Sequence, residues 1–133
     1  MSRSTLCFLA AVILLSSPTL IGAAWAQTPW VAPETEKAKK NPLPADKKSV
    51  DQGAKVAKTN CVSCHGEGGK GDGAAAAALN PKPADWTSSR VQDETDGELF
   101  WKISNGRGAM PQWKFLPEND RWALVRYIRS LKK

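Results

Sequence analysis

The residues of this chain that can bind a metal or act as nucleophiles are few, and several lie in one short stretch. The chain has 133 residues, with a single histidine, three cysteines and two methionines. The histidine and two of the cysteines occur together as Cys61-Val62-Ser63-Cys64-His65. Sites that need two histidines within the chain, such as HExxH zinc sites and two-histidine iron triads, are therefore excluded.

The order C-x-x-C-H is the signature of covalent haem attachment. Two thiols one helical turn apart can add to the two vinyl groups on one edge of a porphyrin, and the next residue then presents its imidazole to the iron. We interpret Cys61 and Cys64 as the attachment residues of one covalent haem c, and His65 as an axial iron ligand.

Three other sites share parts of this motif. A thioredoxin-like redox pair would lie in a βαβ pattern, and the sequence shows none. A zinc site would need a fourth ligand besides Cys61, Cys64 and His65. In an exported protein the two cysteines could also form a simple disulfide. Haem attachment is favoured because the surrounding sequence is helical and carries an export signal.

Haem iron held by one imidazole needs a sixth ligand or keeps an open position. After removal of an N-terminal signal, Met110 is the single methionine left. It lies in the loop Asn105-Gly106-Arg107-Gly108-Ala109-Met110-Pro111, where glycines let the backbone approach a porphyrin. We predict that Met110 is the second axial ligand, with core packing as the alternative. A His/Met pair raises the reduction potential and suits electron transfer.

The N-terminal 48 residues precede the C-x-x-C-H motif and contain two segments of different composition. A secretory signal peptide is predicted over residues 1–26, from Arg3, an apolar run over 6–15 and the cleavage sequence Ala24-Trp25-Ala26. The run is shorter than the roughly 20 residues that span a bilayer, so cleavage and a periplasmic location without a membrane span are expected, and an uncleaved anchor is the alternative. Residues 27–48 are rich in proline and lysine, which predicts a flexible, mostly disordered arm.

Residues 49–133 are predicted to form one all-α haem domain. The capping boxes Ser49-Val50-Asp51-Gln52 and Thr95-Asp96-Gly97-Glu98 indicate two helix starts, with ends near Asn60 and at Asn105-Gly106. A short helix is expected over 74–79, and a last helix begins near Pro117 with apolar residues at the helical period. No strand pattern of comparable strength appears.

The domain resembles the class I c-type cytochromes, which are small soluble monohaem electron carriers. The resemblance covers about Val50 to Lys133, and its matching pieces are Gly53, Cys61 to Gly66, Gly71-Asp72-Gly73, Pro83 to Trp86, Asn105-Gly106 through Met110-Pro111, and Trp122 to Ile128. It implies the cytochrome c fold, with four to five short helices around one covalent haem and with Gly53 against Tyr127 where the first and last helices cross. Relatives commonly have a proline at the position of Ala74 whose carbonyl accepts the imidazole N–H, so this role is expected of the Ala74 carbonyl.

Several further residues are candidates for haem packing. Leu99 and Ile103, spaced i and i+4, are expected to pack directly on the haem. Trp86 and Trp113, together with Trp101, lie in segments that should wrap the porphyrin, and the alternative is that they are apolar walls that replace a protein core. Arg107 is a candidate for pairing with a haem propionate.

The charge balance bears on partners. The net charge is +6, and lysines are scattered over the haem domain, which favours docking to redox proteins with an acidic surface; solubility alone is the alternative. Nucleic-acid binding is not expected, because no helix carries a basic cluster.

We therefore expect a monomeric periplasmic electron carrier that cycles between Fe(II) and Fe(III) and is not an enzyme. Two alternatives stay open. One is a dedicated electron-transfer subunit of a larger dehydrogenase or reductase, and the other is a haem ligand sensor with a labile Met110.

Overall fold

The computed structural model describes residues 29–133, and their regular structure is helical. The elements are α1 (Glu34–Lys37), α2 (Lys47–Asn60), α3 (Val62–His65), the 3-10 turn η1 (Ala76–Ala78), α4 (Ser89–Gln92), α5 (Asp96–Asn105) and α6 (Glu118–Ser130). Residues 29–133 contain no strand, and only Arg107 and Met110 form an isolated antiparallel bridge. The predicted all-α fold class is confirmed. The predicted signal peptide lies outside the described residues.

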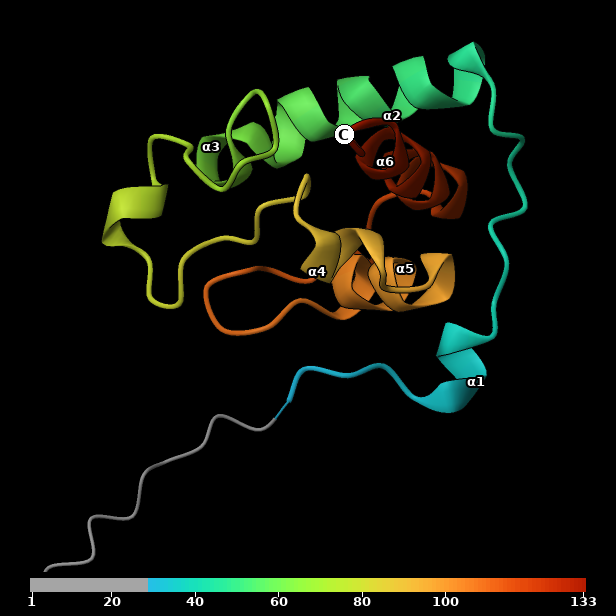
Figure 1. Cartoon of the computed structure of the whole chain (residues 1–133), viewed down its shortest axis with the longest axis horizontal. Coiled ribbons are helices and arrows are strands. Elements are labelled where there is room, and N and C mark those ends of the chain that lie inside the picture. The colour runs from blue at the N-terminus through green and yellow to red at the C-terminus, as the bar shows by residue number, and fades with distance from the viewer. Residues whose placement is uncertain (1–28) are drawn as a thin grey trace, which may run out of the picture.

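The crossing of α2 and α6 organises the domain. Figure 1 shows α2 running across one face of the molecule with α6 beneath it, seen nearly end-on. A Cβ atom on Gly53 would lie 2.0 Å from the carbonyl oxygen of Ala123 and 2.8 Å from the Cβ of Tyr127. The two helices can approach this closely only because Gly53 has no side chain. The expected contact of Gly53 with Tyr127 is confirmed.

The core lies between α5 and α6, beneath this crossing. Phe100 on α5 and Trp122 on α6 stack with ring centroids 3.9 Å apart. Leu124 and Val125 on α6 are 2% and 0% exposed, which agrees with the apolar face predicted for the last helix. Among the described residues, no helix is long and apolar enough to span a bilayer.

Two of the predicted helix starts have different outcomes. The Thr95 side chain accepts a hydrogen bond from the Glu98 N–H at 3.1 Å and caps α5, as predicted. By contrast, α2 begins earlier than predicted, because Asp46 caps it by accepting from the Ser49 N–H at 2.8 Å. Ser49 is thus a buried residue of the first turn and not the N-cap, so that prediction was wrong. The helix expected over 74–79 is reduced to the short turn η1.

Residues 29–48 are packed against the domain, which differs from the expected flexible arm. Ala32 is 3% exposed, and the Asn41 side-chain amide donates to the carbonyl of Trp122 at 3.0 Å. Arg126 on α6 donates to the carbonyl of Leu43 at 2.9 Å from Nε. Composition reports only the apolar surface that a segment can bury, whereas much of this packing uses backbone carbonyls as hydrogen-bond acceptors.

Candidate functional site

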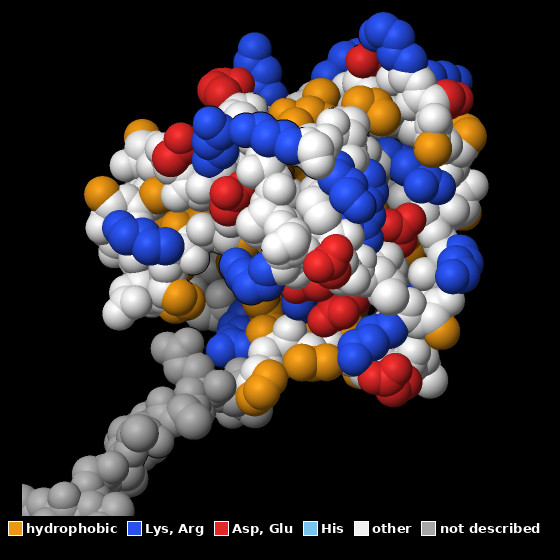
Figure 2. All heavy atoms as spheres, viewed as in Figure 1, with side chains coloured by type: hydrophobic (Ala, Val, Ile, Leu, Met, Phe, Trp, Pro, Cys, Tyr) orange, Lys and Arg blue, Asp and Glu red, His pale blue; other side chains and the backbone are white. Residues whose placement is uncertain are grey.

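A cavity of about 730 Å³ lies beside the core, within the size range of cofactor pockets. Its walls come from the end of α2, from α3, α4, α5 and α6, and from the loops that precede α4 and follow α5. All eight residues predicted for the site line it: Cys61, Cys64, His65, Trp86, Leu99, Ile103, Met110 and Trp113. In Figure 2 the face drawn is hollowed toward its lower left.

The two cysteines are placed by the junction of α2 and α3. Cys61 lies between the two helices as the C-cap of α2 and the N-cap of α3, and its N–H donates to the carbonyl of Ala57 at 2.8 Å. Cys64 follows within the single turn of α3 and is half-buried. Both thiols are free, and burial together with the neighbouring Cys64 raises the pKa of Cys61 to about 11. Before haem is attached, the thiol of Cys61 is therefore protonated at pH 7.

The loop after His65 fixes the orientation of the imidazole. Gly66 ends α3 at a positive φ of 78°, and a Cβ there would lie 2.0 Å from a carboxylate oxygen of Asp72. The chain then returns so that His65 Nδ1 lies 3.0 Å from the carbonyl oxygen of Ala84. A carbonyl can only accept, so Nδ1 carries the proton and Nε2 keeps its lone pair for a metal.

The acceptor for the imidazole N–H differs from the expected one. The sequence resemblance indicated the carbonyl of Ala74, and the structure uses that of Ala84. The backbone just before Ala74 packs against α3 instead. A Cβ on Gly73 would lie 2.4 Å from the carbonyl oxygen of Ser63. Ala84 follows Pro83, which restricts the backbone just before the acceptor.

The surroundings of His65 favour its neutral form. Burial lowers the pKa of His65, and the hydrogen bond to Ala84 opposes this only in part. The ring also stacks on Trp86, with centroids 4.4 Å apart and planes 22° apart. Trp86 is itself fixed, because its carbonyl accepts from the Gln92 side-chain amide at 2.6 Å. A neutral, oriented imidazole is the form that coordinates iron.

A tight loop after α5 positions Met110. The N–H of Arg107 donates to the carbonyl of Met110 at 2.9 Å, and the reverse bond measures 3.0 Å. Gly106 permits this turn, since a Cβ there would lie 2.4 Å from the Met110 carbonyl oxygen. The N–H of Trp113 donates to Ile103 at 3.2 Å and ties the loop back to α5. The thioether is thereby carried on a short loop anchored at both ends.

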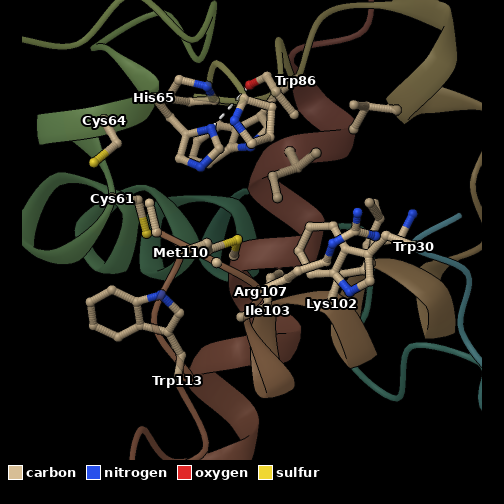
Figure 3. Close-up of a pocket in the computed structure, with 18 of the residues that line it drawn as sticks. Trp30, Cys61, Cys64, His65, Trp86, Lys102, Ile103, Arg107, Met110 and Trp113 are labelled. Carbon is tan, nitrogen blue, oxygen red and sulfur yellow. Dashed lines mark hydrogen bonds between the residues drawn. The ribbon is translucent and has the colours of Figure 1, made fainter. Parts of the chain in front are cut away.

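The potential ligands converge from different sides of the cavity. Figure 3 shows the imidazole of His65 and the thioether of Met110 facing the space from two directions, with Cys61 and Cys64 along one side. Two thiols, one neutral imidazole and one thioether are the donor set that attaches and ligates a c-type haem. The residues present therefore fit that group.

Apolar side chains form the rest of the walls. Leu99 and Ile103 are each 5% exposed and line the cavity from α5. Trp113 lines it from the Met110 loop. Trp101, which was grouped with Trp86 and Trp113 in the sequence, is not among the lining residues, because α5 presents Leu99 and Ile103 on that face.

The sequence reasoning missed Trp30. It lies in the segment predicted to be a flexible arm, yet it lines the cavity. The ammonium of Lys102 lies 5.6 Å from its ring centroid, and the guanidinium carbon of Arg107 lies 5.8 Å from it. The signal available was a tryptophan in a segment otherwise poor in large apolar residues.

Comparison with known proteins adds independent information. Residues 48–128 match the family model described as cytochrome c oxidase, cbb3-type, subunit III. A solved structure titled Kuenenia stuttgartiensis reducing HAO-like protein complex Kustc0457/Kustc0458 is similar, with 27% identity and a TM-score of 0.60 over 69% of this chain. The match spans 47% of that longer chain. No match was found among curated proteins.

The family match covers more than half of the chain and includes the C-x-x-C-H motif and Met110. The resemblance inferred from the residues is thus confirmed by a family-level match and by a structural neighbour. The chain belongs to this family of c-type cytochrome domains, which bind haem c and transfer electrons.

Proposed function

We propose that the protein is an exported, periplasmic monohaem electron carrier with a covalent haem c and His/Met axial ligation. One observation carries the proposal: a single cavity brings together Cys61, Cys64, His65 and Met110. These four side chains come from two segments far apart in the sequence, and each supplies a group that a ligated c-type haem requires.

Each of these residues has a defined task. The thiols of Cys61 and Cys64 can each add across a vinyl group, so that an S–H bond breaks, a C–S bond forms and the hydrogen passes to carbon. His65 offers Nε2 because Nδ1–H is held by the carbonyl of Ala84 at 3.0 Å. Met110 offers its thioether from the anchored loop. When bound, the haem supplies reversible one-electron exchange between Fe(II) and Fe(III).

This arrangement favours electron transfer over catalysis or sensing. His65 and Met110 together would hold the iron of a bound haem, and this would leave no coordination position for a substrate or a gas. The loop that carries Met110 is held by two backbone hydrogen bonds of 2.9 and 3.0 Å to Arg107 and one of 3.2 Å to Ile103. We therefore expect the Met110 ligand to be stable and not labile.

Carbon monoxide tests this proposal. The reduced full chain should show no rapid change of its haem spectrum on addition of carbon monoxide, because no axial position is open. The variant Met110→Ala should bind the gas rapidly and have a lower reduction potential. Phe115→Ala, an exposed apolar change further along the same loop, is the matched control and should behave as the wild type. Rapid binding to the wild type would contradict the carrier assignment.

A dedicated subunit of a larger redox enzyme is the second candidate. It is supported by the family description, which names a subunit of an oxidase, and by the structural neighbour, whose title names a protein complex. Stable co-purification of the tagged chain with a dehydrogenase or reductase from its native membrane or periplasmic fraction would favour the subunit. Recovery of the chain alone, in a form that exchanges electrons with several soluble partners, would favour the shuttle.

The proposed partners are redox proteins with an acidic docking surface. The net charge of the chain is +6, and Figure 2 shows Lys and Arg side chains over the face drawn, with Asp and Glu between them. Such a surface steers an acidic partner through long-range attraction. The rate of electron exchange with an acidic partner should fall as ionic strength rises.

A further inference from the structure

The segment before the family-matched region reaches the cavity that holds the proposed haem ligands. The family match begins at residue 48, whereas Pro29 and Trp30 line the cavity. Exposure alternates along this stretch: Trp30 is half-buried, Val31 is 50% exposed and Ala32 is 3% exposed. Trp30 and Ala32 thus face the domain, and Val31 faces solvent.

Three separate contacts hold this segment in place. The backbone of α1 rests on α5, where a Cβ on Gly97 would lie 2.0 Å from the carbonyl oxygen of Glu36. The Asn41 amide donates to the carbonyl of Trp122 at 3.0 Å. Arg126 donates to the carbonyl of Leu43 from two of its nitrogens, at 2.9 and 2.5 Å. The position of Trp30 is therefore supported by several elements of the domain.

Trp30 lies close to two cationic side chains at the cavity wall. Lys102 Nζ is 5.6 Å and Arg107 Cζ is 5.8 Å from its ring centroid, within the range of cation–π attraction. Lys102 is itself held by Glu94 at 2.6 Å and Glu98 at 3.1 Å. The Lys, Arg, Asp and Glu residues that line the cavity carry more positive than negative charge. The positive residues are Lys82, Arg90, Lys102 and Arg107, and the negative one is Glu94.

The place of this group in the cavity identifies the part of the haem that it would contact. Figure 3 shows Trp30, Lys102 and Arg107 on the side of the cavity away from Cys61 and Cys64. The two propionate carboxylates of a haem lie at the porphyrin edge opposite the two vinyl groups. If the cysteines hold the vinyl edge, the group around Trp30 faces the carboxylate edge, where positive charge is complementary to the ligand.

We propose that residues 29–46 are a built-in part of the haem site, in which the Trp30 ring covers the carboxylate edge of the cofactor close to Lys102 and Arg107 and raises its reduction potential. This inference rests on the proposed haem site. Fe(III) haem carries one more positive charge than Fe(II) haem, so water at this edge stabilises the oxidised form. The Trp30 ring excludes that water, which favours the reduced form.

The test compares three variants of the full chain, loaded with haem in an exporting host. Trp30→Ala removes the ring, Trp30→Phe keeps a smaller apolar ring, and Val31→Ala alters the neighbouring residue that faces solvent. The readouts are the midpoint potential at fixed pH and ionic strength, together with helical circular dichroism to show that the fold is retained.

The expected result is a graded one. Trp30→Ala should lower the midpoint potential, Trp30→Phe should lower it by less than half as much, and Val31→Ala should leave it at the wild-type value. Unchanged potentials in both Trp30 variants would overturn the proposal. Equal shifts in Trp30→Ala and Trp30→Phe would also overturn it, because the ring would then not be the element that excludes water.

The outcome separates this inference from the proposed function. A wild-type protein without a redox-active haem would contradict the proposed function itself. A wild-type protein with a redox-active haem, alongside Trp30 variants of identical potential, would contradict only the role of residues 29–46. If Trp30→Ala fails to accumulate as a folded protein, the sign of the shift in Trp30→Phe still decides the matter.

Discussion

The substitution Gly53→Ala probes the helix crossing that supports the whole site. A Cβ at residue 53 would lie 2.0 Å from the carbonyl oxygen of Ala123, 2.5 Å from its carbonyl carbon and 2.8 Å from the Cβ of Tyr127. All three neighbours are backbone or first side-chain atoms of α6, so none can rotate away. The helices must separate, and the core residues beneath the crossing must repack.

Two opposing terms set the magnitude. Alanine is a better helix former than glycine by about 1 kcal/mol, which favours the variant. Overpacking a tight contact costs typically about 1–3 kcal/mol, and occasionally more. A clash with rigid backbone belongs at the upper end of that range, so we expect a net loss of about 2 kcal/mol. In a domain of this size that corresponds to a decrease of roughly 8–16 °C in Tm.

Guanidinium unfolding of the haem-loaded protein, followed by circular dichroism, measures this change. The midpoint should fall with little change in the slope m. Gly68→Ala is the matched control, because the nearest atom to its added Cβ is 3.9 Å away and its φ is not positive. The control should be neutral or slightly stabilising. A Gly53→Ala protein as stable as the wild type, or more stable, would refute the close crossing of α2 and α6.

Two further predictions concern the helix caps. Thr95→Ala removes the acceptor for the Glu98 N–H at the start of α5. It should lower the free energy of unfolding, measured by urea titration, by about 0.5–2 kcal/mol. Thr59→Ala on the exposed face of α2 is the control, and equal effects of the two changes would contradict the cap. The hydrogen bond from Ser49 lowers the pKa of Asp46 below its ordinary value of 3.8. The ionised Asp46 carboxylate therefore stabilises the folded state at neutral pH, and this stabilisation is lost as the pH falls from about 4 through the lower folded pKa. The Tm difference between wild type and Asp46→Ala should shrink over that range, and a difference that grows on acidification would contradict this cap.

The parts of the fold that follow from local sequence were predicted well. The Thr95 side-chain cap and the glycine that ends α5 depend only on neighbouring residues, and both are present in the structure. Met110 and the C-x-x-C-H motif were likewise recognisable from residue type and spacing, and the structure places them around one cavity. The start of α2 was misplaced because Asp46 and Ser49 are both residue types that favour the N-cap position. Tertiary packing decides between them, since Ser49 is buried within the first turn and Asp46 caps the helix.

Features that depend on long-range folding could not be predicted. The carbonyl that accepts from His65 belongs to Ala84 because the loop after α3 makes a wide turn before it returns, and no local pattern specifies that path. The packing of residues 29–48 was missed because its hydrogen bonds join residues more than 80 positions apart, as between Asn41 and Trp122. The place of Trp30 at the cavity depends on these contacts.

The mass of the intact protein under denaturing conditions tests the central claim most directly. The chain should be produced in a host that exports it and attaches c-type haem. Two thioether bonds from Cys61 and Cys64 would keep the cofactor on the unfolded chain, so the account predicts the mass of the polypeptide plus one haem. The mass of the polypeptide alone, from a preparation that shows a haem spectrum before denaturation, would contradict covalent attachment at this site.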